Sequence, residues 1–223
     1  MKLSVIIPVY NEIDTIGEAL DRVRAVEIDK QIIVADDCST DGTSDFVQSQ
    51  PDITVVQNSC NLGKGASIRA ALKHVDGDIV IIQDADLEYD PQDYPKLIQP
   101  ILDDKADMVY GTRFARGRPK MRLANYLANK LFAWMATVLY RTRVTDEATC
   151  YKAFRTQIIN GLDLRCNRFE FCPEVTARLL KRGYRYAEVP IWYEARTRAQ
   201  GKKITWVDGL ECIWTLIKYR FVG

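Results

Sequence analysis

The fold is decided by the stretch Asp78-Ile79-Val80-Ile81-Ile82-Gln83-Asp84-Ala85-Asp86, a continuous apolar run that ends in two acidic residues. Such a run, without polar alternation, is typical of a strand that is buried on both faces of a parallel sheet. Because Asp84 and Asp86 are two positions apart, their carboxylates project to the same side where the strand ends. Two like charges this close repel by roughly 1 to 4 kcal/mol. We therefore expect a cation between them, and oxygen ligands of this kind suit Mg²⁺ or Mn²⁺.

The same alternation of an apolar strand, a polar loop and a helix recurs through the first half of the chain. Alternation at this spacing indicates an α/β fold with a doubly wound, mainly parallel sheet. After residue 111 the sequence becomes basic and aromatic, and we expect one domain, 1–223, with a basic helical C-terminal portion. Strands are predicted at 3–9, 32–35, 54–56, 79–82, 107–110 and, at a sheet edge, 186–192, and the longer helices at 13–23, 91–102, 121–141 and 205–221.

Polar motifs follow several of these strands, at the carboxyl ends where sheets of this class bind their ligands. Asp36 and Asp37 end the second strand, where an acid commonly accepts hydrogen bonds from a ribose or base; they can also form the turn that follows. Lys64 lies between two glycines at a helix start and can meet a phosphate. Asp90, directly before Pro91, is the better helix cap and leaves Asp84 and Asp86 for another role. The sequence thus predicts one nucleotide-type site.

Two nucleotide-binding classes are disfavoured, because the chain has neither a P-loop G-x-x-x-x-G-K-[ST] nor a G-x-G-x-x-G after its first strand. The only histidine, His74, rules out histidine triads and His-rich zinc sites. The spacing of the six cysteines shows no pairing pattern, which indicates a reduced, cytoplasmic protein. We expect no signal peptide, no membrane-spanning run and no nucleic-acid partner, so any membrane contact would be peripheral.

The near-neutral net charge of +1 conceals a strong asymmetry. Residues 1–109 hold 21 acidic and 9 basic side chains, whereas residues 110–223 hold 9 and 22, so the halves carry about −12 and +13. Solvated faces that happen to differ would explain this. Alternatively, the acidic half binds a metal and the basic half receives phosphates or an anionic membrane surface.

Four motifs in order, at 4–12, 36–43, 61–65 and 83–87, resemble those of the glycosyltransferase family 2 enzymes, which have a Rossmann-like GT-A fold. Segments 111–114, 146–155, 169–171 and 198–203 extend the similarity to the dolichol-phosphate mannosyltransferase group. The resemblance implies transfer of a hexose, from a nucleotide sugar of the GDP-mannose or UDP-glucose type, to a polyprenyl or dolichyl phosphate. Residues 1–110 would then be the nucleotide- and metal-binding half and 111–223 the acceptor-side half.

The resemblance also implies roles for single residues. Asp84 and Asp86 would bridge the metal to the diphosphate, and Glu88 falls where the group often has glutamine as a further metal-site residue. Pro8, Tyr10, Glu12 and Asp37 would bind the base and ribose, and Arg113, Arg122, Arg198 and Lys203 would meet donor or acceptor phosphates. The chain departs from the group's G-x-S-K at 201–203 and from its stretch ending G-F-R at 146–152, which leaves the sugar and the acceptor open.

An inverting transfer is the leading hypothesis, and the acceptor decides which residues it needs. A hydroxyl acceptor requires a carboxylate base, and the candidates are Asp146, Glu170 and Glu174. A polyprenyl phosphate is already anionic and needs cations instead. Two other classes stay open, a nucleotidyltransferase and a sugar-nucleotide-binding protein without catalysis. The apolar stripes of helices 121–141 and 205–221 suit a membrane interface, but core packing or a homodimer explains them at least as well.

Overall fold

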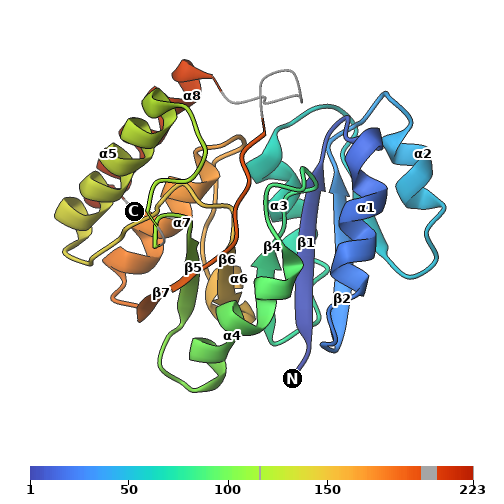
Figure 1. Cartoon of the computed structure of the whole chain (residues 1–223), viewed down its shortest axis with the longest axis horizontal. Coiled ribbons are helices and arrows are strands. Elements are labelled where there is room, and N and C mark those ends of the chain that lie inside the picture. The colour runs from blue at the N-terminus through green and yellow to red at the C-terminus, as the bar shows by residue number, and fades with distance from the viewer. Residues whose placement is uncertain (116, 197–204, 223) are drawn as a thin grey trace.

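The computed structural model describes residues 1–115, 117–196 and 205–222, whose strands form one seven-stranded sheet in the order β3-β2-β1-β4-β6-β5-β7. Helices pack on both faces of the sheet (Figure 1). The strands are β1 (Leu3–Val9), β2 (Lys30–Asp36), β3 (Thr54–Gln57), β4 (Ile79–Ile82), β5 (Met108–Thr112), β6 (Lys152–Arg155) and β7 (Tyr186–Pro190). The helices are α1 (Ile13–Arg24), α2 (Thr43–Gln48), α3 (Lys64–Leu72), the short 3₁₀ turn η1 (Pro91–Asp93), α4 (Tyr94–Leu102), α5 (Leu123–Tyr140), α6 (Thr156–Asn160), α7 (Phe171–Lys181) and α8 (Trp206–Phe221).

The first half of the chain is a parallel α/β unit, as the sequence predicts. Strand β1 pairs in parallel with both β2 and β4, so that Val5 lies between Ile32 and Ile81. Strand β3 extends the sheet beyond β2, again in parallel. The apolar run of β4 is buried throughout, and that of β1 is buried at every position except Pro8, because helices cover both faces. The prediction of a doubly wound, mainly parallel sheet is confirmed.

Strand β6 was not predicted, and it is antiparallel to both of its neighbours, β4 and β5. Its sequence, Lys-Ala-Phe-Arg, is too short and too polar to indicate a buried central strand. The structure accommodates it because the amine of Lys152, fully buried, donates to the backbone carbonyls of Glu147 and Thr149 at 2.6 and 2.5 Å. Beyond β5, the expected edge strand is confirmed as β7.

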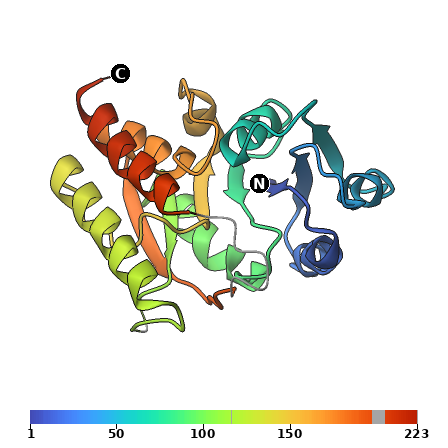
Figure 2. The ribbon, with the colours of Figure 1, turned by 90° about the horizontal axis from the view of Figure 1, so that it is seen from above.

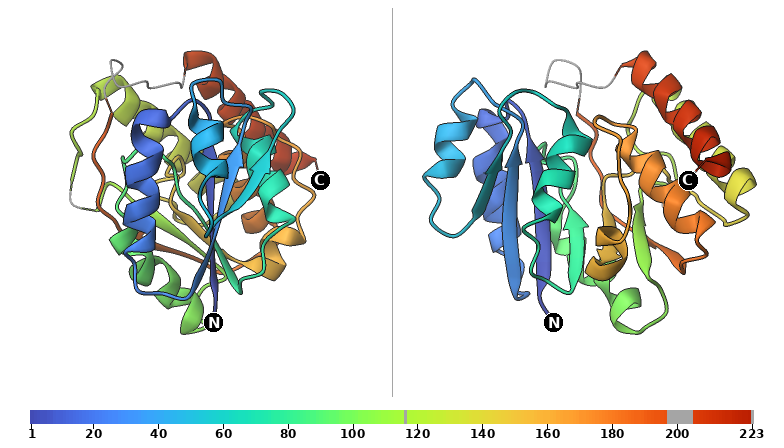
Figure 3. Two further views of the ribbon diagram at one scale, coloured as in Figure 1. Left: turned by 90° about the vertical axis from the view of Figure 1, so that its right-hand side faces the viewer. Right: turned by 180° about the vertical axis from the view of Figure 1, so that it is seen from behind.

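Helices α5, α7 and α8 form a layer at the β7 end of the sheet, seen from above in Figure 2 and from behind in Figure 3. The predicted long helices are confirmed, and α8 begins with a capping box in which Thr205 and Asp208 bond each other's backbone and side chain. No helix in the described part of the chain combines the length and apolar character that a membrane span needs.

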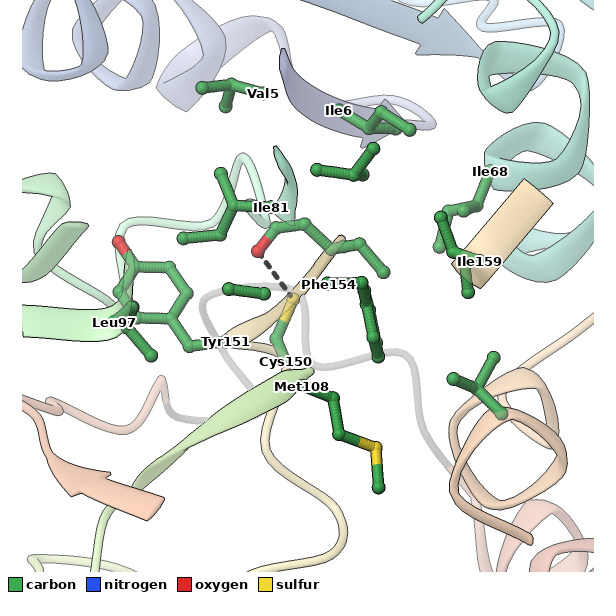
Figure 4. Packing of buried hydrophobic residues seen from close by; sticks show 14 of the residues in the cluster. Val5, Ile6, Ile68, Ile81, Leu97, Met108, Cys150, Tyr151, Phe154 and Ile159 are labelled. Carbon is green, nitrogen blue, oxygen red and sulfur yellow. Dashed lines mark hydrogen bonds between the residues drawn. The ribbon is translucent and has the colours of Figure 1, made fainter. Parts of the chain in front are cut away.

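The core beneath the strand ends is apolar and closely packed (Figure 4). Cys150, Tyr151 and Phe154 bring the β6 region against Ile81 of β4 and Met108 of β5. The Cys150 thiol lies 3.9 Å from the carbonyl oxygen of Ile82, at the last position of β4. Burial raises the pKa of this thiol well above its ordinary value, so it stays protonated as part of the core. This packing fixes the end of β4, which Asp84 and Asp86 follow.

Candidate functional site

Gln83 anchors the residue that follows β4. Its side-chain carbonyl accepts hydrogen bonds from the hydroxyls of Tyr94 and Tyr151, at 2.8 and 2.6 Å, and its amide donates to the backbone oxygen of Asp84. All three side chains are buried. Because Gln83 holds the backbone of residue 84 in place, the position from which the Asp84 carboxylate projects is fixed.

Asp84 and Asp86 each face a cation. The Lys64 amine lies 2.5 Å from the Asp84 carboxylate, and an Arg196 guanidinium nitrogen lies 3.6 Å from that of Asp86. The two acidic side chains keep about a fifth of their surface, 20% and 22%, open to solvent. In the structure, a protein side chain supplies the positive charge beside each of these acids.

Lys64 is placed by the tight start of α3. Gly63 has a φ of +99°, and a side chain there or at Gly65 would come within 2.6 Å of the backbone oxygen of Asn167 or Cys166. Only glycine allows this approach, which brings α3 against residues 166–168. Withdrawal from water lowers the pKa of the Lys64 amine, but attraction to Asp84 outweighs it and the pKa is raised, so the amine remains charged.

A strap formed by residues 193–196 crosses the acidic edge. Tyr193 forms an isolated bridge with Tyr89, and the backbone N–H of Arg196 donates to the Glu88 carboxylate at 2.7 Å. The Arg196 guanidinium also lies 2.9 Å from the Glu12 carboxylate. Arg196 therefore joins the end of β1 to the end of β4.

Arg196 is a site residue that sequence reasoning missed, although it lies two positions before the predicted Arg198. Its carboxylate partners Glu12 and Asp86 are more than 100 positions away in the chain. Only the fold reveals such a pairing. Arg198 and Lys203 themselves lie outside the described residues.

Glu88 does not join Asp84 and Asp86 in a ligand group. The described residues contain no cluster of three or more His, Cys, Asp or Glu side chains that could hold a metal ion. The Glu88 side chain is 8% exposed and accepts from the strap instead. The arrangement favours two carboxylates, with Glu88 holding the segment that crosses them.

Asp36 and Asp37 are buried and fully used in holding loops. Asp36 accepts from the backbone and hydroxyl of Ser39 and from Ser44 and Gln57. Asp37 accepts from the backbone N–H groups of Leu62 and Gly63, at 2.8 and 2.7 Å, and from Asn58. The turn-forming role is therefore the one the geometry displays, and Asp37 contributes by fixing the loop that carries Lys64.

Arg113 and Asp146 form a buried ion pair at the start of the basic loop, which is the cation-rich segment 113–120. Two guanidinium nitrogens and the backbone N–H of Arg113 donate to the Asp146 carboxylate at 2.6 to 2.9 Å. Burial lowers the pKa of Arg113, but the Asp146 charge outweighs it and the net pKa is raised. Glu188 accepts from the backbone of Thr145 and Asp146, which fixes this loop from β7.

Glu170 and Glu174 lie at the start of α7 and hold the loop that packs on α3. Glu174, fully buried, accepts from the backbone N–H groups of Arg165 and Cys166 and from the Arg178 guanidinium. Glu170 accepts from the backbone of residues 167 and 168. Burial raises the pKa of Glu174, but the backbone hydrogen bonds outweigh it and leave the pKa lowered.

The remaining predicted residues belong to the end of β1 or to the start of α5. Pro8 belongs to β1, and Tyr10 and Glu12 follow it before α1 begins. Arg122 is the exposed residue directly before α5. The structure therefore brings the β1, β3–α3 and β4 motifs together at one edge, while Arg122 lies on the segment that enters α5.

This fold and edge define an α/β protein of the Rossmann-like class, with acids and cations gathered at the carboxyl ends of its parallel strands. The chain belongs to the glycosyl transferase family 2, whose family model matches residues 4–162. The resemblance of the motifs is thereby confirmed.

Relatives extend the similarity over nearly the whole chain. An undecaprenyl-phosphate mannosyltransferase of Micrococcus luteus is 27% identical over 217 residues, which cover 91% of this chain and 87% of the relative. A dolichyl-phosphate hexose transferase of Haloferax volcanii is 29% identical, covering 87% and 83%. A dolichol-phosphate mannosyltransferase of Pyrococcus furiosus is 29% identical over 91% of this chain, but this chain spans only 59% of its length.

Solved structures confirm the fold. Glucosyl-3-phosphoglycerate synthase of Mycobacterium tuberculosis in complex with phosphoglyceric acid superposes with a TM-score of 0.79 at 20% identity, covering 100% of this chain and 81% of that one. The same enzyme with Mn²⁺, uridine diphosphate and phosphoglyceric acid gives a TM-score of 0.77 at 20% identity, covering 100% and 79%. The GT-A type sheet is thus shared.

Proposed function

We propose that the chain transfers a hexose, with inversion, from a nucleoside-diphosphate sugar to a polyprenyl phosphate. The observation that carries this proposal is the edge where Asp84 and Asp86 face Lys64 and Arg196. A diphosphate with its metal ion brings both signs of charge, so it can replace these internal ion pairs group for group. Relatives that act on polyprenyl phosphates support the acceptor class.

The carboxylates also support a phosphate acceptor over a hydroxyl acceptor. The three base candidates, Asp146, Glu170 and Glu174, all accept hydrogen bonds from an arginine or from the backbone of a loop. A general base must reach the acceptor proton, and Asp146 and Glu174 are fully buried. A polyprenyl phosphate already carries negative charge and needs no such base.

Asp84 and Asp86 fit a divalent cation. Mg²⁺ is usually held by one or two carboxylates together with substrate phosphates and waters, and these two side chains are the partly exposed pair at the strand end. When bound, the metal would neutralise charge on the departing nucleoside diphosphate. Lys64 then remains beside the donor phosphates as a fixed cation, and Gln83 keeps the Asp84 backbone in place.

The two halves of the chain divide the substrates in this proposal. Residues 1–110 hold the nucleotide sugar and metal, with Glu12, Tyr10 and Pro8 at the β1 end toward the base and ribose. Residues 111–223 receive the acceptor phosphate through the basic loop that begins at Arg113. Nucleotide sugar and lipid phosphate would meet at the cytoplasmic face of a membrane.

Incubation with labelled GDP-mannose or UDP-glucose, Mg²⁺ and a polyprenyl phosphate tests the proposal. We expect a labelled glycolipid that disappears when a chelator removes the metal. Transfer to a sugar or alcohol hydroxyl but not to the lipid phosphate would establish a hydroxyl acceptor instead. Donor binding without turnover over a broad acceptor panel would establish a non-catalytic binding protein. Formation of a nucleotide sugar from a sugar phosphate would establish a nucleotidyltransferase.

A further inference from the structure

Helices α5 and α8 lie side by side as the outermost elements at one end of the molecule (Figure 2). A side chain added at Gly209 of α8 would contact Phe132 of α5, and the Tyr140 hydroxyl donates to the Leu216 carbonyl at 2.6 Å. Because 132 lies near 209 and 140 near 216, the helices run in the same direction. They therefore present one continuous outer face.

This outer face is apolar. The side chains that these helices bury include Phe132 and Ala136 of α5 and Cys212 and Leu216 of α8. Of the sixteen large apolar residues that are exposed in the described chain, ten lie on these two helices. They are Leu123, Leu127, Leu131, Trp134 and Val138 of α5 and Trp206, Val207, Leu210, Trp214 and Phe221 of α8.

The stripe that the sequence identifies on α5 is thus directed to solvent, and the core-packing explanation of it is wrong. Three of the chain's four tryptophans lie on this face, with exposed fractions of 61% for Trp134, 77% for Trp206 and 63% for Trp214. A contiguous exposed patch of this kind marks an interaction surface. Tryptophan is favoured at membrane interfaces because its ring is apolar and its N–H is polar.

The charges around the face select its occupant. Helix α5 contains no acidic residue and is flanked by cations at both ends, and α8 ends with two more. These are Arg118, Lys120 and Arg122 before α5, Arg141 and Arg143 after it, and Lys218 and Arg220 in α8. A second copy docked face to face would bring the cations at the ends of α5 against those of its partner, with only Asp208 and Glu211 at the start of α8 to offset them. An anionic lipid surface neutralises them instead.

We propose that the outer face of α5 and α8 docks on a bilayer that contains anionic lipids, with its tryptophans in the headgroup region. This rests on the proposed function, since a lipid-borne acceptor must reach the site from a bilayer. The face is placed to deliver it, because α5 begins directly after the basic loop that starts at Arg113.

The test is co-sedimentation of the full chain with vesicles of phosphatidylcholine alone or with phosphatidylglycerol added, without polyprenyl phosphate or donor. We expect binding that is stronger on the anionic vesicles and a blue shift of tryptophan fluorescence. The double variant Leu127→Gln with Leu210→Gln should bind about tenfold more weakly, through lost apolar burial. Leu102→Gln, which changes a leucine exposed to 45% on α4, is the control away from this face and should bind as wild type.

Three outcomes would overturn the proposal: wild type that binds neither vesicle, a Leu102→Gln effect as large as the double variant's, or self-association abolished by the double variant without vesicle binding. The last would assign the face to a second copy. Transfer to detergent-dissolved polyprenyl phosphate is measured in parallel. Vesicle binding without transfer would refute the proposed function but not the docking. Transfer without vesicle binding would refute the docking but not the proposed function.

Discussion

The acids that end β2 and those that follow β4 lie at the same edge of the sheet but differ in what they contact. Asp36 and Asp37 are buried and accept hydrogen bonds from neutral donors in fixed loops. Asp84 and Asp86 stay partly exposed and face the amine of Lys64 and the guanidinium of Arg196. Carboxylates satisfied by neutral donors within loops belong to the scaffold, whereas carboxylates balanced by the charged side chains of Lys64 and Arg196 can accept a charged ligand in their place.

Replacing one of the partly exposed carboxylates, Asp84 or Asp86, gives the largest expected loss of activity. Asp86→Asn should lower glycolipid formation by about a thousandfold, because a metal-holding charge is lost. The melting temperature should stay unchanged, since the Asp86 side chain makes one backbone hydrogen bond, from Glu88, and a 3.6 Å ion pair. Turnover and thermal unfolding measured on one preparation check both.

The matched control for this variant is Asp37→Asn at the end of β2. It leaves three donors competing for one carbonyl oxygen, and we expect a loss of about 1 to 3 kcal/mol in unfolding free energy. Full activity in Asp86→Asn, or an unchanged stability in Asp37→Asn, would remove the distinction between the two sets.

The buried Arg113–Asp146 pair should give the largest loss of stability. Asp146→Asn leaves the buried Arg113 guanidinium without its countercharge, which costs about 3 to 5 kcal/mol. Denaturant unfolding measures it. A double variant that also replaces Arg113 by Leu should recover part of the loss. No recovery would mean that the loss does not come from the unpaired charge of Arg113.

A smaller effect on stability is expected at Glu174, and it should depend on pH. Glu174→Gln should cost about 2 kcal/mol at pH 7, because the carboxylate serves two backbone donors and Arg178. The pKa of Glu174 is lowered by folding. Its stabilisation is therefore present above the unfolded value, about 4.3, and lost as pH falls through the lower folded value.

Unfolding of wild type and Glu174→Gln at pH 7 and at progressively lower pH measures this dependence. The difference between them should shrink in acid. Glu18→Gln, which removes an exposed partner of Arg22, is the control and should change stability by no more than about 0.5 kcal/mol. A difference that grows in acid would contradict the assigned direction of the pKa.

How much the sequence could predict is visible in helices α1 and α5. The apolar stripe of α1 is buried, as Ile16 and Leu20 show, because charged residues occupy its other face and leave one way to pack. Helix α5 is apolar nearly all round, so its sequence does not choose a face. The core takes Phe132 and Ala136, and the more conspicuous stripe with Trp134 faces solvent.

The site divides in the same way. Residues that follow a strand, such as Asp84, could be placed at the sheet edge from the chain order alone, and Asp90 could be identified as the cap of η1. Strand β6 and Arg196 could not. Their positions depend on pairings between distant segments, and the charges at Lys152 and Arg196 are accommodated only by contacts that the fold creates.

The smallest effect, but the most direct comparison of ligand with internal cation, is expected at Arg196. Its guanidinium lies 3.6 Å from the Asp86 carboxylate, so a metal ion must compete with it. Arg196→Gln should tighten Mn²⁺ binding in the absence of donor by about three- to tenfold, as expected when roughly 1 kcal/mol of competing attraction is removed. Calorimetric titration measures this. Arg185→Gln, which removes a cation paired with Asp104 and Asp107, should leave the affinity unchanged. Weaker metal binding in Arg196→Gln would mean that the arginine preorganises the carboxylates by offsetting the repulsion among Glu12, Asp84 and Asp86. Asp84 and Asp86 would then be as much a part of the scaffold as the acids of β2.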